Sequence, residues 1–394
     1  MTSLRILHLV SYPLYSGPMP HVLGLAKAQR TAGNDVWIAY DTKRGNFDGF
    51  EEEAQPYIEA SGFATVPMEL SAKSAPFAMW RDAKTLATVV KDRRIDVVHA
   101  HMSHDHVIMA MALRDESMKR IVRARTVHAA RSLENRFGQR MLLTRADAWI
   151  VRSQAHSRDI LNRFRLDASR VHVVPGSVDA TVFAPRPHDI RLAFRRRFDL
   201  PEDALLIVHV ALIAPGRGQE ELVRALAQMG DAPVHAMFVG RGESEHAVRE
   251  LARGLGIAHR VHFAGYVALP ELVDVYASAD LAFVARPGND AASRAALEAM
   301  ACEKPVLALR EGALAETVTD RVGFPVSTVT PELITRALRN VLDDRGDALV
   351  RGRSARELVL RDRTFAREVT LTRNAYVSAG ALPANARLEP PEAL

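Results

Sequence analysis

Short apolar segments alternate along the chain with longer segments in which apolar residues recur every three or four positions. The short segments are rich in Val, Ile and Leu, which is typical of strands that are buried on both faces of a parallel sheet. The longer segments have helical spacing, so the alternation predicts an α/β protein whose helices cover parallel strands. The expected strands are 5–12, 35–40, 96–101, 120–126, 148–153, 170–176, 205–212, 234–240, 260–265, 281–286, 305–310 and 323–327.

These strands form two series, which predicts two Rossmann-like, doubly wound domains. A chain of 394 residues is long enough for two domains. Two prolines and a charge cluster in 180–190 favour a linker there. We therefore expect a first domain over 1–185 and a second over 186–364, and the last residues, 383–394, are expected to form a flexible tail.

Composition narrows the class of protein. The net charge of +5 suits anionic ligands or an anionic membrane surface. Nucleic acid is not an expected partner, because aromatics make up only 6% and no basic stretch is interleaved with them. The single cysteine, Cys302, excludes an internal disulfide and fits a reducing cytoplasm. No apolar run approaches the roughly 18–20 residues of a membrane-spanning helix, and the N-terminus is interpreted as a first strand rather than a signal peptide.

Ligands of open parallel sheets bind beyond the carboxyl ends of the strands, and two such domains predict a site in the cleft between them. One candidate loop follows the strand 281–286 and leads to a helix that is expected to begin near Ala292 or Ser293. The first amides of such a helix can bind a phosphate. Asp290 in the loop and Glu298 in the helix could accept hydrogen bonds from sugar hydroxyls. The alternative is that Glu298 is a salt-bridged or exposed helix residue.

Two other loops have the same position after a strand. Arg217 lies in the turn Pro-Gly-Arg-Gly and could pair with a phosphate through its guanidinium, or it could be an exposed arginine in a surface turn. Gly17 follows the first strand and could let the backbone approach a ligand closely, although glycine is common in any turn. Neither a dinucleotide fingerprint nor a Walker lysine is present.

The chain has fifteen histidines. The segment His-Ala-His-Met-Ser-His-Asp-His at 99–106 has some likeness to a metal cluster, with His99 and His101 on one face of a strand. A second group of ligands is not evident in the sequence, so these histidines are interpreted as structural and no metal is expected. His128 follows the strand 120–126 and is expected at the mouth of the cleft.

Taken together, these segments resemble glycosyltransferase family four, over about residues 4–380 and in the family's order. The N-terminal half contributes the glycine turn with its following helix and two segments before the linker, and the C-terminal half contributes three segments of a nucleotide-binding domain. They are HVLGLAKAQRTAGNDV, RADAWIVRSQAHSRDIL, RVHVVPGSVDATVFAP, MFVGRGE, RVHFAGYVALPELVDVYASADLAFVAR and ALEAMACEKPVLAL.

The resemblance implies the GT-B architecture of two facing Rossmann-like domains, with the segment 365–380 crossing back onto the first. It implies a retaining enzyme that moves a hexosyl group from a UDP- or GDP-linked sugar to a glycan or lipid-linked acceptor, without a metal or other cofactor. The expected setting is bacterial cell-surface polysaccharide or glycolipid synthesis, in the cytoplasm or at the inner membrane face.

The family's E-x7-E pattern maps onto Asp290 and Glu298. By resemblance, Glu298 would bind the ribose hydroxyls of the donor, and Asp290 would stand at the donor sugar. The amides of Ala292 and Ser293 would hold the distal phosphate, and Arg217 falls where the family has a phosphate-binding lysine.

Further matches place the base and the reacting sugar. Gly265, Tyr266 and Val267 match the loop whose backbone meets the base. Gly17 matches the second glycine of the family's Gly-Gly turn, and His128 matches the histidine near the reacting sugar.

Three positions depart from the family. Asp290 replaces a glutamate and reaches roughly 1.3–1.5 Å less far. Leu212 stands where an arginine is usual beside the phosphates, and Ser16 replaces the first glycine. Arg241 or Arg294 could compensate. These departures leave room for a non-catalytic paralogue that acts as a binding or partner subunit, and a hydrolysing or epimerising sugar-nucleotide enzyme is a third reading.

A possible helix over 131–146 would carry a row of arginines that could meet anionic lipid or glycan, or simply form a solvated face. The row consists of Arg131, Arg136, Arg140 and Arg145.

Overall fold

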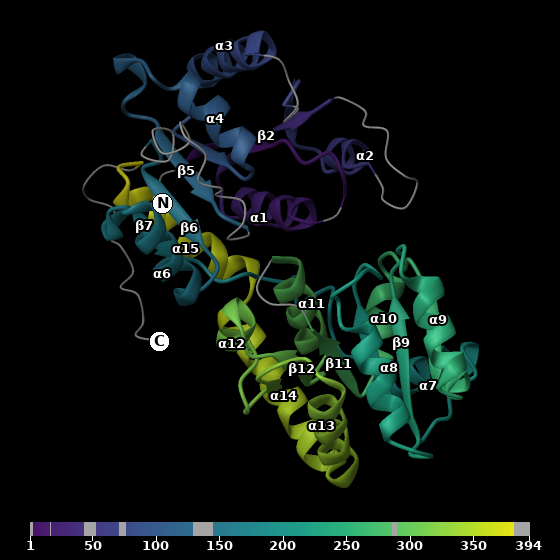
Figure 1. Cartoon of the computed structure of the whole chain (residues 1–394). Coiled ribbons are helices and arrows are strands. Elements are labelled where there is room, and N and C mark those ends of the chain that lie inside the picture. The colour runs from purple at the N-terminus through teal and green to yellow at the C-terminus, as the bar shows by residue number, and fades with distance from the viewer. Residues whose placement is uncertain are drawn as a thin grey trace. The chain divides into compact units, whose positions relative to one another are not determined.

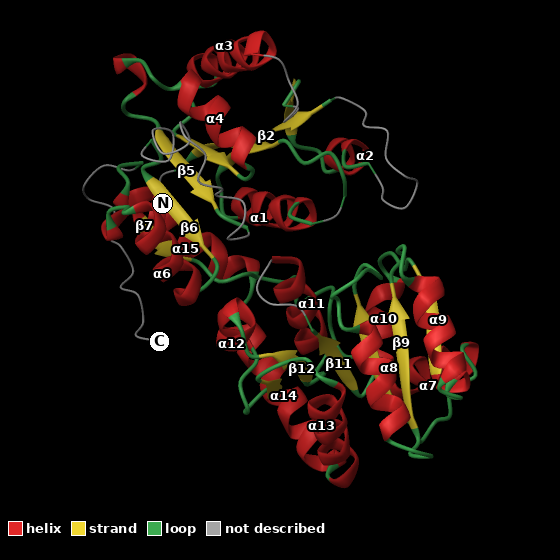
Figure 2. Cartoon of the chain, in the orientation of Figure 1, coloured by secondary structure: helices red, strands yellow, loops and turns green. Residues whose placement is uncertain are grey.

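A computed structural model of the chain describes residues 3–15, 17–42, 53–70, 76–128, 145–285 and 290–381, with no side-chain description at 76 and 290–293. The chain forms two compact units. Unit 1 contains Met1–Pro175 together with Phe365–Leu394, and unit 2 contains Gly176–Thr364. Each unit is a parallel sheet with helices between its strands, so the predicted α/β fold is confirmed (Figures 1 and 2).

The sheet of unit 1 has seven strands in the order β3-β2-β1-β4-β5-β6-β7. All neighbouring pairs are parallel, for example β1 with β4, where His8 lies opposite His99. The chain order therefore reverses between β1 and β4, which is the point where open sheets of this kind bind ligands. The strands are β1 (Arg5–Val10), β2 (Asp35–Asp41), β3 (Ala64–Met68), β4 (Val97–Ala100), β5 (Val122–Thr126), β6 (Ala148–Val151) and β7 (Val171–Val173).

Helix α15 comes from the C-terminal end of the chain but belongs to unit 1, where it packs against α1. Its Glu368 is buried and forms an ion pair with Arg152, at 2.7 Å between Oε1 and Nη1. The helical elements of unit 1 are α1 (Met19–Thr31), α2 (Gln55–Ala60), α3 (Pro76–Asp92), α4 (Ser103–Ala112), η1 (Glu116–Met118), α6 (Gln154–Phe164), η3 (Ala168–Arg170) and α15 (Phe365–Ser378).

The sheet of unit 2 has six parallel strands in the order β10-β9-β8-β11-β12-β13. Its order reverses between β8 and β11, as that of unit 1 does between β1 and β4. The strands are β8 (Leu205–Val210), β9 (Val234–Val239), β10 (Val261–Gly265), β11 (Leu281–Val284), β12 (Val306–Leu309) and β13 (Gly323–Val326).

The helical elements of unit 2 cover both faces of its sheet (Figure 1). They are α7 (His188–Arg197), α8 (Gln219–Gln228), α9 (Glu245–Gly254), η4 (Ala258–Arg260), α10 (Glu271–Ser278), α11 (Asp290–Ala301), α12 (Gly312–Thr317), α13 (Pro331–Asp343) and α14 (Arg345–Asp362).

Alternating side chains of the central strand β8 explain the two layers of helices. Leu206 and Val208 pack into a core with α7, α10, α11 and α14, whereas Leu205 and Ile207 pack into a second core with α8, α9 and α13. Successive residues of a strand point to opposite faces, so β8, which is apolar at five of its six positions, must be covered on both sides.

Three details differ from the sequence predictions. Strand β3 was not predicted. Helix α11 begins at Asp290, not near Ala292 or Ser293, so Asp290 is the first helical residue and not part of the turn. The boundary between the units lies after Pro175, ahead of the expected linker at 180–190, and α7 already begins at His188.

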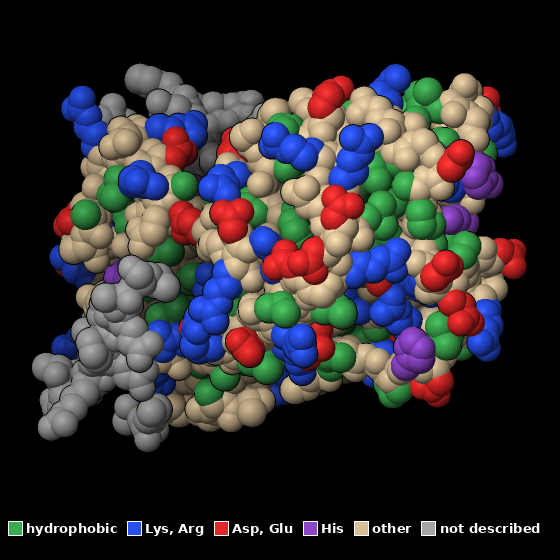
Figure 3. Space-filling model, turned by 90° about the horizontal axis from the view of Figure 1, so that it is seen from below, with side chains coloured by type: hydrophobic (Ala, Val, Ile, Leu, Met, Phe, Trp, Pro, Cys, Tyr) green, Lys and Arg blue, Asp and Glu red, His purple; other side chains and the backbone are tan. Residues whose placement is uncertain are grey.

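The surface carries charges of both signs. On the face shown in Figure 3, Lys and Arg side chains lie among Asp and Glu side chains. Some of them form exposed ion pairs, such as Arg249 with Glu245 within α9. Within the part of the chain that the structure describes, no helix has the length and apolar character needed to cross a membrane.

Candidate functional site

In unit 2, the loops that follow β8, β9 and β10 are bonded to one another at the carboxyl edge of the sheet. Gly240 donates its amide hydrogen to the carbonyl of Gly265 at 2.7 Å, and Ile213 donates to the carbonyl of Arg241 at 3.0 Å. Ser244 in turn donates to the carbonyl of Ile213 at 3.2 Å. The three loops therefore form one connected backbone surface at the edge where ligands are expected.

Glycines make this close approach possible. A Cβ added at Gly240, whose φ is +140°, would lie 2.1 Å from the carbonyl oxygen of Ala211, and one added at Gly242 would lie 2.0 Å from that of Ile213. Gly218, with φ +91°, would place a Cβ 2.2 Å from the Cβ of Ala285, which follows β11. Only glycine fits at these positions, so the turn Pro-Gly-Arg-Gly packs closely against the end of the adjacent strand.

Arg217 and Leu212 lie in the loop between β8 and α8, directly beside the reversal of strand order. Arg217 is half-buried and immediately precedes Gly218. Leu212 is 48% exposed, and its carbonyl accepts a hydrogen bond of 3.0 Å from Nε2 of Gln219. An apolar side chain is thus presented to solvent at the position where the resemblance expects an arginine.

Glu298 is buried, with 7% of its surface exposed, and both of its carboxylate oxygens have partners. Tyr276 of α10 donates a hydrogen bond of 2.9 Å to Oε2, and Nε of Arg294 lies 3.4 Å from Oε1. Burial raises the pKa of Glu298, while Arg294 and the Tyr276 hydrogen bond oppose the rise. The geometry agrees with the alternative that Glu298 is a salt-bridged residue. It disagrees with the alternative that Glu298 is exposed. A buried, oriented carboxylate remains able to accept hydrogen bonds from paired hydroxyls.

The loop after β10 holds three further predicted residues. Gly265 has a positive φ of +68° and ends the strand. Tyr266 is 45% exposed, whereas Val267 packs against the core that contains α11. A Cβ at Gly265 would lie 4.0 Å from Nε of Arg241, so this arginine stands beside the same loop.

Several predicted features fall on residues that the structure does not describe. Ser16 and the side chains of Asp290, Ala292 and Ser293 lie outside the described residues. The same is true of the arginine row over 131–146, apart from Arg145, whose Nη1 donates to the carbonyl of Ala110 at 3.4 Å.

In unit 1, Gly17 and His128 follow β1 and β5. Gly17 has φ +53°, and a Cβ there would touch the ring of Tyr12 at 3.4 Å. His128 is 9% exposed, and its Nε2 lies 3.1 Å from Nδ1 of His101.

His101 belongs to a buried cluster that the sequence only partly indicated. His8 from β1 joins His99 and His101, and one ring nitrogen of each lies within 4.8 Å of the others, a spacing that could hold a metal ion. His104 and His106 lie in α4 and are not part of this group. The nitrogens already have partners, since His8 Nδ1 lies 2.8 Å from His101 Nε2 and both nitrogens of His99 are bonded, so a metal would have to break existing hydrogen bonds.

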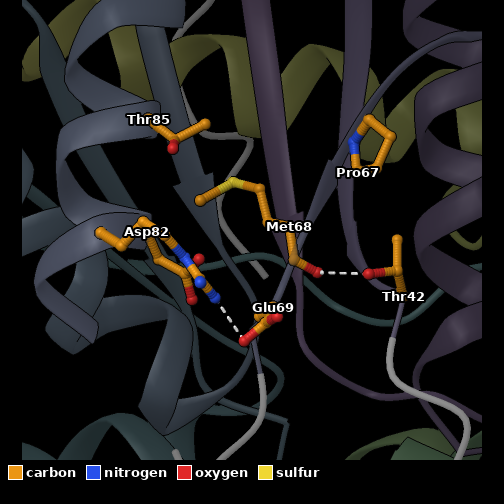
Figure 4. A pocket seen from close by; sticks show the side chains of 7 residues that line it. Thr42, Pro67, Met68, Glu69, Asp82 and Thr85 are labelled. Atoms are coloured by element: carbon orange, nitrogen blue, oxygen red, sulfur yellow. Dashed lines mark hydrogen bonds and ion pairs between the residues drawn. The ribbon is translucent and has the colours of Figure 1, made fainter. Parts of the chain in front are cut away.

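A separate pocket of about 240 Å³ lies at the carboxyl ends of β2 and β3, beside α3 (Figure 4). Thr42 donates a hydrogen bond of 3.2 Å to the carbonyl of Met68, and Arg81 forms an ion pair with Glu69. Asp82 is 3% exposed, and its Oδ2 has no hydrogen-bond partner among the described residues. Burial raises the pKa of Asp82. No motif or spacing in the sequence indicated this pocket.

Comparison with known proteins identifies the class. Residues 191–358 match the family described as "Glycosyl transferases group 1", and residues 16–182 match "Glycosyltransferase Family 4". The two matches together extend over most of both units. The chain belongs to glycosyltransferase family four and has the GT-B architecture of two Rossmann-like domains.

Two curated relatives of the chain are named "D-inositol 3-phosphate glycosyltransferase". The protein from Kineococcus radiotolerans is 32% identical over 228 residues, which are 52% of this chain and 52% of that protein. The protein from Salinispora tropica is 33% identical over 235 residues, which are 55% of this chain and 48% of that protein. The matched chain thus spans about half the length of these relatives.

Solved structures agree in fold. A glycosyltransferase from Rickettsia africae matches this chain with a TM-score of 0.82 at 18% identity. The match covers 98% of this chain and 100% of the Rickettsia chain. Anabaena HepE in complex with UDP matches this chain with a TM-score of 0.77 at 21% identity. The match covers 95% of this chain and 100% of the HepE chain.

Proposed function

We propose that the chain is a retaining glycosyltransferase that moves a hexosyl group from a UDP- or GDP-linked sugar to a hydroxyl of a glycan or lipid-linked acceptor. Unit 2 would bind the donor, and unit 1 would carry the acceptor side. The observation that carries this proposal is the buried Glu298, whose carboxylate is oriented by Tyr276 and Arg294 within the region that matches the transferase family. Burying a carboxylate is costly, and an oriented pair of acceptor oxygens suits the two hydroxyls of a ribose.

In the proposed reaction, the bond from the sugar's anomeric carbon to the diphosphate breaks, and a bond from the same carbon to the acceptor oxygen forms on the same face. The acceptor proton passes to the departing phosphate. The negative charge that develops on the diphosphate would be stabilised by Arg217 and by the first amides of α11. Asp290 and His128 would position the donor sugar, and the loop at Gly265, Tyr266 and Val267 would meet the base.

The chemical class of the acceptor is also part of this proposal. The names of the relatives contain D-inositol 3-phosphate, whereas the resemblance to the family favours a glycan or lipid-linked acceptor. A role in bacterial cell-surface polysaccharide or glycolipid synthesis follows from the second class of acceptor. Peripheral binding at the inner membrane face would accompany a lipid-linked acceptor.

The first experiment is a thermal-shift screen with UDP, GDP, ADP and their hexose conjugates. A ligand at about 100 times its dissociation constant stabilises the folded state by roughly 2.7 kcal/mol. We expect a shift with one nucleotide that is lost in Glu298→Ala. The matched control is Glu357→Ala, because Glu357 lies on α14 of the same unit and is 70% exposed. No shift with any nucleotide would contradict the proposal.

The second experiment identifies the product. The nucleotide sugar that binds is incubated with D-inositol 3-phosphate or with lipid-linked glycans, and the product is analysed by mass spectrometry and by NMR of the anomeric linkage. A glycoside with the donor's anomeric configuration supports a retaining transferase, and an altered free sugar supports a hydrolase or epimerase.

A non-catalytic paralogue that acts as a partner subunit is the second candidate. The exposed Leu212 favours it, because a charged hydrogen bond to the phosphates would be missing there. Such a bond contributes about 1.5–3 kcal/mol. Nucleotide binding without any transfer to either acceptor class would favour this candidate.

A further inference from the structure

A continuous row of hydrogen bonds links His128 to the interior of unit 1. His128 contacts His101, His101 contacts His8, and His8 contacts Gln29 of α1, at 3.1, 2.8 and 2.7 Å. Beyond Gln29, the row continues through the hydroxyl of Tyr376 on α15 and through His99, and it ends at Thr126. His8, His99 and His101 are fully buried, where water does not reach their ring nitrogens. These nitrogens therefore form their hydrogen bonds with neighbouring side chains.

The protonation state of the row follows from burial. Burial lowers the pKa of His8 to about 4 and lowers the pKa values of His99 and His101 well below the ordinary value. The three rings are therefore neutral near pH 7, and each carries one hydrogen and one lone pair.

The direction of each bond follows from Gln29. Its Oε1 can only accept, so His8 carries its hydrogen on Nε2 and a lone pair on Nδ1. His101 must then donate from Nε2 to His8, which leaves a lone pair on His101 Nδ1. His128 must in turn donate from Nε2 to His101.

The other half of the row agrees with this direction. Nε2 of Gln29 donates to the Tyr376 oxygen at 3.3 Å, so the single hydroxyl hydrogen of Tyr376 is available for Nδ1 of His99 at 2.7 Å. His99 then donates from Nε2 to Oγ1 of Thr126, also at 2.7 Å. Every member of the row donates to the next, from His128 to Thr126.

We infer that His101, oriented by His8 and Gln29, is a positioning residue that fixes the tautomer of His128. In the neutral ring of His128 the hydrogen is on Nε2 and the lone pair is on Nδ1. In that tautomer Nδ1 can only accept a hydrogen bond, and Nε2 is the donor. The role of His128 toward the donor sugar rests on the proposed function, but the tautomer does not.

The tautomer is measured directly by NMR of the full chain with ¹⁵N-labelled histidine. Long-range ¹⁵N–¹H spectra at pH 7 distinguish the two tautomers by the shifts of their nitrogens, and single His→Gln variants assign the signals. We expect hydrogen on Nε2 in His8, His101 and His128. Hydrogen on Nδ1 of His101 or His128 in the wild-type protein would overturn the inference. This result needs no enzyme activity.

The same spectra test the metal alternative. Zn²⁺ added in equal amount should leave the ¹⁵N shifts of His8, His99 and His101 unchanged, because their nitrogens are already bonded to one another and to neighbouring groups. Zinc-dependent shifts in all three rings would mean that the nitrogens are metal ligands, and the proposed row of hydrogen bonds would be wrong.

A pair of matched variants tests the effect on transfer. His101→Gln removes the ring that bonds to His128. His99→Gln disturbs an equally buried histidine whose two ring nitrogens bond to Tyr376 and Thr126. A small displacement of a positioning group can cost up to about a hundredfold in rate. We expect kcat to fall at least about tenfold in His101→Gln and less than about threefold in His99→Gln, with unchanged nucleotide-induced thermal shifts. Equal losses in the two variants would show a merely structural role.

The two proposals fail in different ways. A wild-type protein without transferase activity, but with the expected tautomers, would contradict the proposed function and leave the positioning of His128 intact. An active protein whose His128 carries its hydrogen on Nδ1 would support the proposed function and contradict the positioning of His128 by His101.

Discussion

The hydroxyl of Tyr276 donates a hydrogen bond of 2.9 Å to Oε2 of Glu298, and both side chains are buried. This bond joins α10 to α11 and opposes the effect of burial, which raises the pKa of Glu298. Burial and the carboxylate also raise the pKa of Tyr276 well above its ordinary value, so the tyrosine stays a donor. Arg294 and the Tyr276 hydrogen bond thus both favour the ionised form of the carboxylate that we propose as the ribose-binding group.

Tyr276→Phe should therefore change the pH dependence of nucleotide binding. Without the hydrogen bond the pKa of Glu298 rises further, so the ionised form is lost at a higher pH than in the wild type. We expect affinity for the bound nucleoside diphosphate to fall on acidification in both proteins, with the midpoint displaced upward in the variant. Calorimetric titrations between about pH 5 and 8 measure this.

Binding in Tyr276→Phe that follows the wild-type pH curve would contradict a role for the Glu298 carboxylate. Removal of one partner of a buried hydrogen bond also costs about 1–3 kcal/mol of folding stability. Thermal unfolding without ligand therefore has to accompany the titrations.

Leu212→Arg is predicted to strengthen nucleotide binding. Leu212 is 48% exposed and lies in the same loop as Arg217, so a longer side chain can be accommodated there. A charged hydrogen bond to a phosphate contributes about 1.5–3 kcal/mol, or roughly one to two powers of ten in affinity. Titration with the nucleotide that binds the wild type measures the change.

The control for this variant is Leu212→Gln, which is polar and of similar length but uncharged. We expect little gain from it. Equal affinities in wild type, Leu212→Gln and Leu212→Arg would show that position 212 does not face the phosphates, and the proposed orientation of the donor would be wrong.

Much of the fold could be predicted because its strands are apolar on both faces. Strands such as β8 and β9 are almost wholly buried, and their apolar runs, each interrupted by a single histidine, are visible in the sequence. Strand β3, with the sequence Ala-Thr-Val-Pro-Met, was missed because it lies at the edge of its sheet and contains Pro67. Proline is tolerated at an edge, where one side of the strand lacks a partner.

The candidate site was less predictable, because its supporting groups are distant in sequence. Family resemblance indicated Glu298, but the spacing of α10 gave no sign that Tyr276 would bond to it. In the same way His8, Gln29 and Tyr376 come from three elements and meet only in the folded unit. Periodicity identifies elements but not which polar side chains meet between them.

Gly24→Ala should destabilise unit 1 by disturbing the contact of α1 with α15. A Cβ at Gly24 would lie 2.3 Å from Cζ of Phe365, so the ring would have to move. Overpacking of this kind costs about 1–3 kcal/mol. Gly254→Ala in α9 is the control, because a Cβ there has no atom within 4 Å.

Calorimetry of both glycine variants measures the difference. We expect a lowered transition for Gly24→Ala and an unchanged or slightly raised one for Gly254→Ala, because alanine favours a helix over glycine. Addition of Phe365→Leu should restore part of the loss in Gly24→Ala. A Gly24→Ala protein that unfolds at the same temperature as the wild type would contradict the close packing of α15 on α1.

Asp82→Asn should stabilise unit 1 at neutral pH. In the folded state burial raises the pKa of Asp82, so the fold binds the proton more tightly than the unfolded chain does. Wild-type stability therefore decreases as the pH rises from the unfolded pKa, about 3.9, through the raised folded pKa, and the full cost is present above both. Asparagine has no charge to bury, so the variant should gain about 1 kcal/mol at pH 7.

Below the unfolded pKa of about 3.9, wild-type Asp82 is protonated in both states, so the advantage of Asp82→Asn should shrink as the pH falls toward 4. Thermal unfolding of both proteins at several pH values measures this, with Asp35→Asn as the control because Asp35 is an exposed acid of the same unit. An advantage that is the same at all pH values would mean that the Asp82 charge is not the cause. Lower stability of the variant at pH 7 would mean that the side chain of Asp82, which lines the pocket of Figure 4, is stabilised there in its ionised form.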